Sequence, residues 1–299
     1  MPTLLAPAKI NATLEILARR DDGYHTLRSV MLPLALYDRI ELEPRATADG
    51  VAAEGVAAFV SSDPALANGN LVTRALAAVG LDDRFDVRLE KAIPVGGGLG
   101  GGSSDAASVL RAAMEGRLGP VPERDWLATA AALGSDVTFF LAGTGALVEG
   151  TGERVTAIGT LPDWWAIVVR PHAFVPTADA YRRLDAARDA GGAPPSRPRA
   201  TSASLAAVDA LQRRDFAALT DALVNDFHET ILAAYPAVAR AADALARAGS
   251  PHVLLSGSGS CLFALFADEA RARDVAARVD PDAYEALFSV PFHHDAAWR

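Results

Sequence analysis

Apolar and polar residues alternate at the start of the chain in the way that a half-buried strand requires. Residues 4–17 contain two short strand-like runs, and in the second run Ile10, Ala12, Leu14 and Ile16 fall on one face. The residues between them, on the opposite face, are polar. Such a strand buries one face and can line a site with the other.

The rest of the chain mixes strand-like and helix-like patterns, which predicts an α+β protein. Further strands are predicted at residues 29–33, 39–43, 85–91, 252–255 and 262–266, with a hairpin over 145–158. Helices are predicted at residues 71–79, 103–117 and 126–133, and helical periodicity runs over 204–248 with a break at Pro236. One more helix and one more strand end the predicted fold.

Three features divide the chain. The Ala/Gly-rich stretch from residue 44 to about 62 is expected to be antiparallel and variable. An apolar run at residues 164–169 is expected to open a second domain, which predicts domains at 1–160 and 161–299. Residues 191–200 contain three prolines and two glycines and are expected to form a surface loop.

Composition narrows the class of protein. Of the 299 residues, 51% are hydrophobic and 22% are charged, as in an ordinary globular enzyme. The net charge of -9 opposes nonspecific attraction to nucleic acid or anionic lipid, so neither partner is expected. The sequence has no apolar run long enough to span a membrane and no signal-peptide pattern. The single cysteine, Cys261, cannot form an internal disulfide, and together these features predict a cytoplasmic protein without a structural metal.

Lysine is nearly absent from the sequence. Of 28 basic residues, only Lys9 and Lys91 are lysines. In a chain that fills basic positions with arginine, a retained lysine suggests a need for a compact ammonium group. The alternative is that both are ordinary surface lysines, and by composition alone the two interpretations are equally good.

A glycine-dense segment carries the strongest chemical signal. It consists of Pro94, Val95, Gly96, Gly97, Gly98, Leu99, Gly100, Gly101, Gly102, Ser103 and Ser104, followed by Asp105. Glycines let backbone N–H groups converge on an anion, and the following helix adds the positive end of its dipole. Ser103 and Ser104 can cap this helix or donate to phosphate and magnesium.

Three alternative roles fit the residues of this segment less well. A flexible linker rarely lies between a strand and an amphipathic helix. A Walker A motif needs a lysine after the glycines, and none is present. The dinucleotide-binding pattern matches by spacing, but no convincing acidic strand end follows about 20 residues later. The segment is therefore interpreted as a cradle for the phosphates of a nucleotide.

Three motifs, in order, resemble the kinase superfamily of galactokinase, homoserine kinase, mevalonate kinase and phosphomevalonate kinase. They are Pro7-Ala8-Lys9-Ile10-Asn11, the glycine segment with its two serines, and Leu255-Ser256-Gly257-Ser258-Gly259-Ser260-Cys261. With Asp22-Gly23-Tyr24-His25, the triple-glycine form and Gly134-Ser135-Asp136-Val137, the closest resemblance is to the 4-diphosphocytidyl-2-C-methyl-D-erythritol kinases. The resemblance implies a two-lobed kinase fold with a mixed α/β N-terminal lobe and a ferredoxin-like C-terminal lobe.

The same resemblance implies the cofactors and the catalytic pair. ATP with Mg²⁺ would be the phosphate donor, and Ser104 is a candidate contact for the metal. Lys9 and Asp136 would form the reacting pair, with Asp136 accepting the proton of the acceptor hydroxyl. Judged by the residues alone, Asp136 would cap a helix after Gly134 and Lys9 would be an exposed strand residue.

The resemblance also implies an acceptor with a cytidine diphosphate group. Its base would be bound by His25 and stacked on Tyr24, with Tyr181, which follows Thr177, on the opposite face. Asn11 would contact the sugar or diphosphate. The nucleotide side would involve Asn70 and Leu71 at the adenine, with Lys91 also within reach of the nucleotide.

The sequence departs from the family pattern at two places. Thr138 stands where the family usually has proline, and Ala12-Thr13 stand where the family usually has a leucine soon after the asparagine. Two alternative functions remain: a sibling kinase acting on homoserine or mevalonate, and a noncatalytic ligand-binding relative. Tyr24 and His25 argue against the first, because neither acceptor has a base. Lys9 and Asp136 argue against the second, because a sensor has no need of both.

Overall fold

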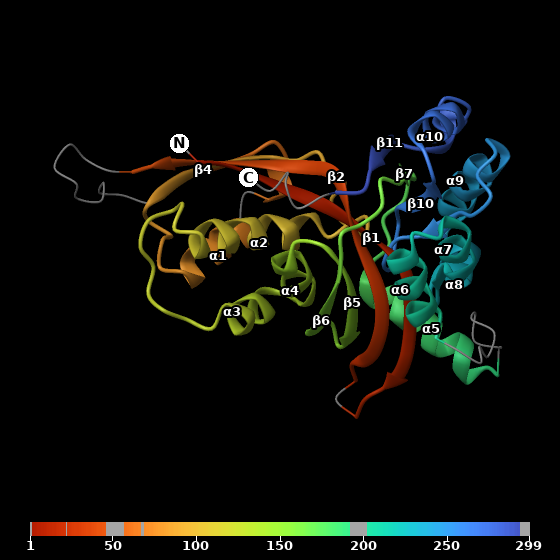
Figure 1. Ribbon diagram of the computed structural model, residues 1–299, viewed down its shortest axis with the longest axis horizontal. Coiled ribbons are helices and arrows are strands. Elements are labelled where there is room, and N and C mark those ends of the chain that lie inside the picture. Colours follow the sequence, from red (N-terminus) through yellow and green to blue (C-terminus); the bar gives the residue numbers. More distant parts are fainter. Residues whose placement is uncertain (1, 22, 46–56, 67–68, 192–201, 294–299) are drawn as a thin grey trace.

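The computed structural model describes residues 2–21, 23–45, 57–66, 69–191 and 202–293. Two lobes lie side by side in Figure 1, with the early elements on the left and the C-terminal helices on the right. Strands β1 (Thr3–Arg19) and β2 (His25–Pro44) are long and run from one lobe toward the other. In the described residues, the strands form two sheets, one of seven strands and one of four.

The larger sheet belongs mainly to the first half of the chain. Its other strands are β3 (Phe59–Ser61), β4 (Phe85–Glu90), β5 (Gly145–Gly150), β6 (Arg154–Gly159) and β8 (Val224–Asn225). The strand order is β3-β4-β2-β1-β8, and β5 pairs with β2 and β6, which confirms the predicted hairpin. The expected antiparallel stretch is wrong at β3, which pairs parallel to β4. Residues 46–56 of that stretch lie outside the described residues.

The predicted early strands merge into two continuous ones. Strand β2 runs through Pro33, which lies after the residues paired with β5 and before those paired with β4. Proline lacks an N–H group, so it is tolerated in a strand where no ladder bond is required on that side. Register shifts interrupt the β1–β2 pairing, one of them between Asn11 and Thr13. There the hydroxyl of Thr13 accepts the N–H of Val30 at 2.8 Å, which satisfies a donor at the irregularity.

Four helices cover one face of this sheet (Figure 1). They are α1 (Leu71–Ala78), α2 (Gly101–Met114), α3 (Trp126–Leu133) and α4 (Ser135–Ala142), with a short 3₁₀ turn, η1 (Pro64–Leu66), before α1. Helix α2 packs against α1, α4 and β1, and its predicted apolar face is fully buried. It begins two residues earlier than predicted, inside the glycines, and ends early because Gly116 adopts a left-handed φ of 71°.

The C-terminal lobe contains a four-stranded antiparallel sheet. Its strands are β7 (Trp165–Arg170), β9 (Leu254–Leu255), β10 (Leu262–Phe266) and β11 (Ala286–Pro291), in the order β11-β7-β10-β9. Helices separate β7 from β9 and β10 from β11, so the chain follows the β-α-β-β-α-β path of a ferredoxin-like lobe. This confirms the expected fold class. The domain boundary near residue 160 stays a prediction.

The helices of this lobe are more numerous than predicted. They are α5 (Thr177–Asp189), α6 (Ala203–Arg213), α7 (Phe216–Ala222), α8 (His228–Ala234), α9 (Pro236–Arg247) and α10 (Glu269–Ala276), with a 3₁₀ turn, η2 (Pro281–Ala283). Pro236 opens α9, as the predicted break requires. Helix α5 was not predicted. The predicted loop at 191–200 lies, apart from its first residue, outside the described residues.

Candidate functional site

The glycine segment lies in the first lobe with its carbonyl groups held by neighbouring elements. Gly97 O accepts from Cys261 N (3.1 Å), Gly98 O from Ser256 Oγ (3.0 Å) and Lys9 Nζ (2.9 Å), and Leu99 O from Lys9 N (3.0 Å). These donors come from β1 and from the loop between β9 and β10, so both lobes hold the segment. The carbonyl side of the segment is therefore occupied by the protein itself.

The N–H side of the segment is open. Gly96, Gly98 and Gly100 have φ values of 71°, 78° and 72°, and among the described residues no acceptor takes their N–H groups. The first hydrogen bond of α2 runs from Ser104 N to Gly100 O, so the preceding N–H groups of the helix have no intrahelical partner. No side chain caps this helix. Free N–H groups at a helix start favour an anion there.

Close packing explains why glycine is needed here. A Cβ atom at Gly98 would collide with the carbonyl of Ser256, and one at Gly100 would lie 2.8 Å from the ring of Phe140. Both residues also have a φ value that disfavours other side chains. The segment can approach its neighbours, and expose its N–H groups, only without side chains at these positions.

A pocket of about 350 Å³ lies beside the segment. Every segment residue from Pro94 to Ser103 lines it, together with Asn70, Leu71 and the apolar Val72. Asn70 caps α1 by accepting the N–H of Thr73 at 2.9 Å, so part of its side chain is committed to the fold. The pocket thus combines an apolar wall with a row of backbone donors.

The two serines of the segment differ in exposure. Ser103 lines this pocket and the larger one next to it. Ser104 is fully buried, and its hydroxyl has no hydrogen-bond partner among the described residues. The contacts of the two serines with phosphate or metal stay predictions, and Ser103 is the one of the two that lines the pockets.

The predicted reacting pair is brought together. Lys9 Nζ lies 3.7 Å from Asp136 Oδ2, where β1 meets the first turn of α4. The side chain of Lys9 is 4% exposed and that of Asp136 is 28% exposed. Burial lowers the pKa of Lys9, and the nearby Asp136 carboxylate partly opposes this effect. Lys9 is therefore not the exposed strand residue, and Asp136 not the helix cap, that the residues alone would suggest.

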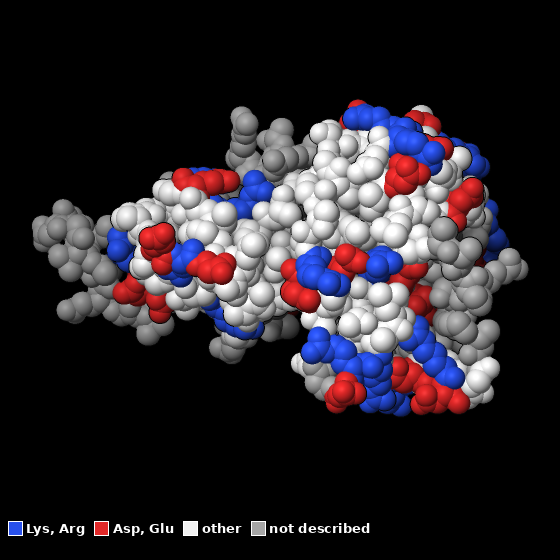
Figure 2. Space-filling view, turned by 60° about the horizontal axis from the view of Figure 1, so that its bottom comes forward, with Lys and Arg blue, Asp and Glu red and all other residues white. Residues whose placement is uncertain are grey.

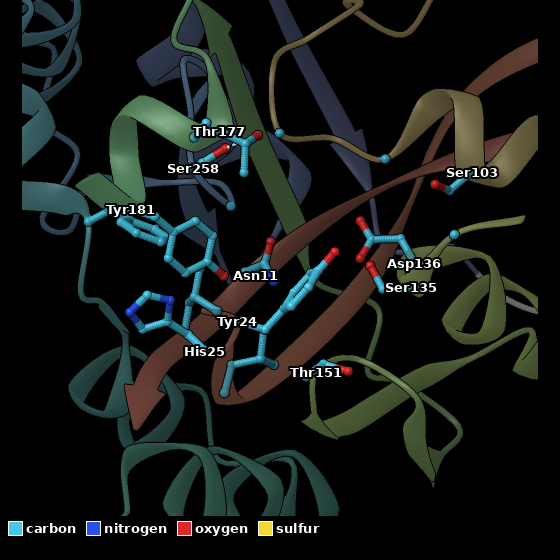
Figure 3. Close-up of a pocket in the computed structure, with 18 of the residues that line it drawn as sticks. Asn11, Tyr24, His25, Ser103, Ser135, Asp136, Thr151, Thr177, Tyr181 and Ser258 are labelled. Atoms are coloured by element: carbon cyan, nitrogen blue, oxygen red, sulfur yellow. Dashed lines mark hydrogen bonds between the residues drawn. The ribbon is translucent and has the colours of Figure 1, made fainter. Parts of the chain in front are cut away.

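A second, larger pocket of about 1220 Å³ contains this pair. It shares Gly98, Gly100 and Ser103 with the smaller pocket, so the two adjoin. Figure 3 shows Asp136, Ser135 and Ser103 on one side of this pocket, His25 and Tyr181 on the other, and Tyr24 between them. A molecule in the larger pocket would meet the carboxylate at the place where the backbone donors end.

The far side of the larger pocket is aromatic. His25 stacks on Tyr181 with ring centroids 4.9 Å apart, and its Nε2 lies 2.8 Å from Asp185 Oδ1. Tyr24 is 68% exposed and lines the same pocket. Thr177, at the start of α5, hydrogen-bonds Ser258 at 2.9 Å. All the predicted acceptor-binding residues therefore line one pocket, although Tyr181 faces His25 in this structure.

Lys91 has a different environment from the one expected. Its ammonium is buried between the carboxylates of Asp38 and Asp105, with the second at 2.7 Å. Burial raises the pKa of Asp105 to about 7, although Lys91 acts to lower it. A Cβ atom at Gly101 would lie 3.2 Å from both Lys91 Nζ and Asp38 Oδ2, so this cluster supports the start of α2. Lys91 also lines the smaller pocket, and its role at the nucleotide stays a prediction.

Sequence reasoning assigned no role to Asp38, Asp105 or Asp185. Asp105 directly follows the two serines, and Asp185 lies one helical turn after Tyr181, so spacing carried some signal for both. Asp38 lies 53 residues before Lys91, and no local pattern joins them. The departure at Thr138 leaves α4 helical from Ser135 to Ala142.

The described residues contain no group of three or more His, Cys, Asp or Glu side chains arranged to hold a metal ion. Among their helices, none has the length and apolar character needed to cross a membrane.

Comparisons with known proteins agree with this geometry. The family described as GHMP kinases N terminal domain matches residues 70–144, and GHMP kinases C terminal matches residues 207–286. A 4-diphosphocytidyl-2-C-methyl-D-erythritol kinase of Symbiobacterium thermophilum is 37% identical over 280 residues, covering 92% of this chain and 94% of the relative. The enzyme of the same name from Deinococcus radiodurans is 40% identical over 279 residues, covering 91% and 86%.

Solved structures give the same result. A crystal structure of 4-(cytidine 5'-diphospho)-2C-methyl-D-erythritol kinase is similar with a TM-score of 0.76 and 33% identity, covering 98% of this chain and all of that one. A homoserine kinase from Cytophaga hutchinsonii is similar with a TM-score of 0.64 but only 19% identity, covering 97% and 94%. The second likeness concerns the fold alone.

Proposed function

The chain belongs to the family of 4-diphosphocytidyl-2-C-methyl-D-erythritol kinases. We propose that it moves the terminal phosphate of ATP to the 2-hydroxyl of 4-diphosphocytidyl-2-C-methyl-D-erythritol, with Lys9 and Asp136 as the reacting pair. This reaction belongs to isoprenoid precursor biosynthesis by the methylerythritol phosphate pathway. One observation carries the assignment of residues: the pair lies where the glycine segment meets the larger pocket.

The glycine segment and the start of α2 bind the triphosphate. Their open N–H groups can contact the phosphates directly, because no side chains lie in the way. The positive end of the α2 dipole adds to the attraction for the phosphates. The apolar wall around Leu71 and Val72 accommodates the adenine. This arrangement places the terminal phosphate near Ser103, which lines both pockets.

Asp136 accepts the proton of the acceptor hydroxyl as the new bond to phosphorus forms. Its carboxylate is partly exposed to the pocket, as a base must be to reach a substrate. Lys9 keeps this carboxylate ionised and offsets the negative charge of the transferring group. The buried ammonium acts strongly because little water surrounds it.

The oxygen donors at this place suit Mg²⁺, which prefers oxygen ligands and keeps several waters when it binds nucleotide phosphates. The hydroxyl of Ser103 is the protein group that would contact it, because that of Ser104 is buried. Bound there with ATP, the ion neutralises charge on the phosphates.

The aromatic side of the larger pocket binds the cytidine end of the acceptor. Tyr24 is exposed and can stack on the base, and Tyr181 provides an aromatic face next to His25. The 2.8 Å contact with Asp185 holds the ring of His25 in place for contact with the base edge. Thr177 and Asn11 line the space between this side and the reacting pair.

The proposed function involves no nucleic acid, and the net charge of -9 does not favour one as a partner. On the face shown in Figure 2, acidic and basic side chains are interspersed. A cytoplasmic location is supported by the lone cysteine, which is buried and free.

We also infer that the chain divides into two domains near residue 160, because β6 belongs to the first sheet and β7 to the second.

The direct test measures ADP formation with the cytidyl diphosphate acceptor beside homoserine and mevalonate. The proposal predicts turnover with the first compound and little with the other two, because neither has a base to occupy the aromatic side. Preferred turnover of homoserine or mevalonate would contradict the substrate assignment. ATP binding without turnover of any of the three would instead support a noncatalytic relative.

A further inference from the structure

A fully buried serine lies behind the reacting pair. Ser29 is on β2 and has no exposed surface. Its hydroxyl donates to the backbone carbonyl of Thr13 at 2.6 Å and accepts from Asn11 Nδ2 at 2.8 Å. Ser29 is not among the residues that line the pockets around the glycine segment, so it has no access to a ligand there.

Thr13, Ser29, Asn11 and Lys9 form a row of hydrogen bonds. The groups at the two ends of this row fix the direction of every bond in it. A backbone carbonyl can only accept, so the proton of Ser29 is committed to Thr13. The oxygen of Ser29 must then accept from the amide of Asn11, which turns the amide oxygen the other way. That oxygen accepts from Lys9 Nζ at 2.6 Å, and an ammonium can only donate. Only one orientation of the Asn11 amide satisfies both neighbours.

This orientation controls the catalytic ammonium. Lys9 has three N–H donors, and two are taken by Asn11 Oδ1 and by Gly98 O at 2.9 Å. Asp136 Oδ2, at 3.7 Å, is too distant for a hydrogen bond. The other two bonds set the direction of the third N–H, which is left for the Asp136 carboxylate or for an incoming phosphoryl oxygen.

We propose that Ser29 is a positioning residue for phosphoryl transfer, which acts through the amide of Asn11 to hold the Lys9 ammonium in its working orientation. The inference rests on the proposed role of Lys9 in the reaction. It assigns to a residue outside both pockets a part in setting the rate, without a contact of its own to either substrate.

The first test replaces Ser29 with alanine. Loss of the Ser29 hydroxyl lets the Asn11 amide turn, so we expect kcat to fall about tenfold while KM for ATP stays within about twofold. Ser108→Ala is the matched control, because Ser108 is also buried and donates to a carbonyl, Leu5 O, but has no contact with Lys9. It should lose stability without losing turnover. Ser29→Cys keeps the volume of the site while weakening both hydrogen bonds, so it serves if the alanine variant does not fold.

The second test asks whether Ser29 acts through Asn11. If it does, adding Ser29→Ala to an Asn11→Ala enzyme changes kcat by less than about twofold. A further tenfold loss in that background would overturn the proposal. So would unchanged turnover in Ser29→Ala, or an effect that falls on KM alone.

A third measurement does not depend on the reaction. The chain has only two lysines, so its ¹⁵N-lysine side-chain NMR spectrum holds two ammonium signals, those of Lys9 and Lys91. Ser29→Ala should broaden or shift the Lys9 signal and leave that of Lys91 in place. An unmoved Lys9 signal overturns the proposal. If the signal moves but the wild type phosphorylates none of the acceptors tested, the proposed function fails and the positioning role of Ser29 stands.

Discussion

Replacing Asp136 with asparagine removes the proposed base with almost no change in size. The side chain lies in the first turn of α4, is 28% exposed and does not line the smaller pocket. The change therefore separates proton transfer from ATP binding. We expect a large fall in kcat with little change in KM for ATP.

Two effects set the magnitude. Loss of a general base costs about 10²- to 10⁴-fold in rate, which is about 3 to 5 kcal/mol in the barrier. The charge pair is also lost: at 3.7 Å and an effective dielectric constant of about 20, its attraction is about 4.5 kcal/mol. Because Asp136 opposes the lowering of the Lys9 pKa by burial, its removal lowers that pKa further. The high-pH loss of any residual activity should therefore begin at a lower pH than in the wild type.

The assay is coupled ADP release at saturating ATP and acceptor, repeated across pH. Asp82→Asn serves as the control, because Asp82 is exposed and lies outside both pockets. Turnover of Asp136→Asn close to that of the control would refute the assignment of the base. A loss confined to KM for ATP would refute the separation of the two pockets.

Three further predictions concern the acceptor, the glycine segment and the buried ion cluster. His25→Ala should raise KM for the cytidyl acceptor about tenfold with kcat nearly unchanged, and a fall in kcat at unchanged KM would contradict the base-binding role. Gly98→Ala should cost more than about 2 kcal/mol in the free energy of unfolding and weaken ATP binding, because a left-handed φ and a collision with Ser256 O act together. Gly80→Ala is its control, with a φ of 74° and open space, and equal losses in the two variants would count against the packing argument. The raised pKa of Asp105, about 7, means that the folded state binds an extra proton between about pH 4 and 7, so stability falls as pH rises through this window by at most about 4 kcal/mol. Denaturant unfolding at pH 5 and 8 should show a smaller pH effect in Asp105→Asn, and an unchanged one would contradict this reasoning.

Local sequence patterns predicted those helices and strands whose own apolar residues repeat with a clear period. The strand at 85–91 and the helices at 71–79 and 126–133 were predicted within a residue or two, because their apolar residues repeat with a clear period. The continuous strand β2 was not predicted, because a proline such as Pro33 usually marks the end of a strand. Whether the strand can continue through it depends on which residues of β2 pair with β4 and which with β5. Helix α5 was missed because only Ala180 and Leu184 are buried on it.

The site shows the same limit. The motifs predicted that Lys9, Asp136 and the glycine segment meet, and the structure brings them together. Which serine lines the pockets depends on where α2 begins, and the start of α2 inside the glycines places Ser104 in the core. The partners of Lys91 lie on β2 and α2, and such long-range pairing leaves no trace in local spacing.

The most direct test of the account is a crystal structure of this protein with a nonhydrolysable ATP analogue and the cytidyl diphosphate acceptor. We predict that the triphosphate lies on the N–H groups of residues 96–103. The acceptor hydroxyl should lie within about 3.2 Å of the Asp136 carboxylate. A triphosphate bound elsewhere, or a hydroxyl beyond the reach of Asp136, would contradict the central claim.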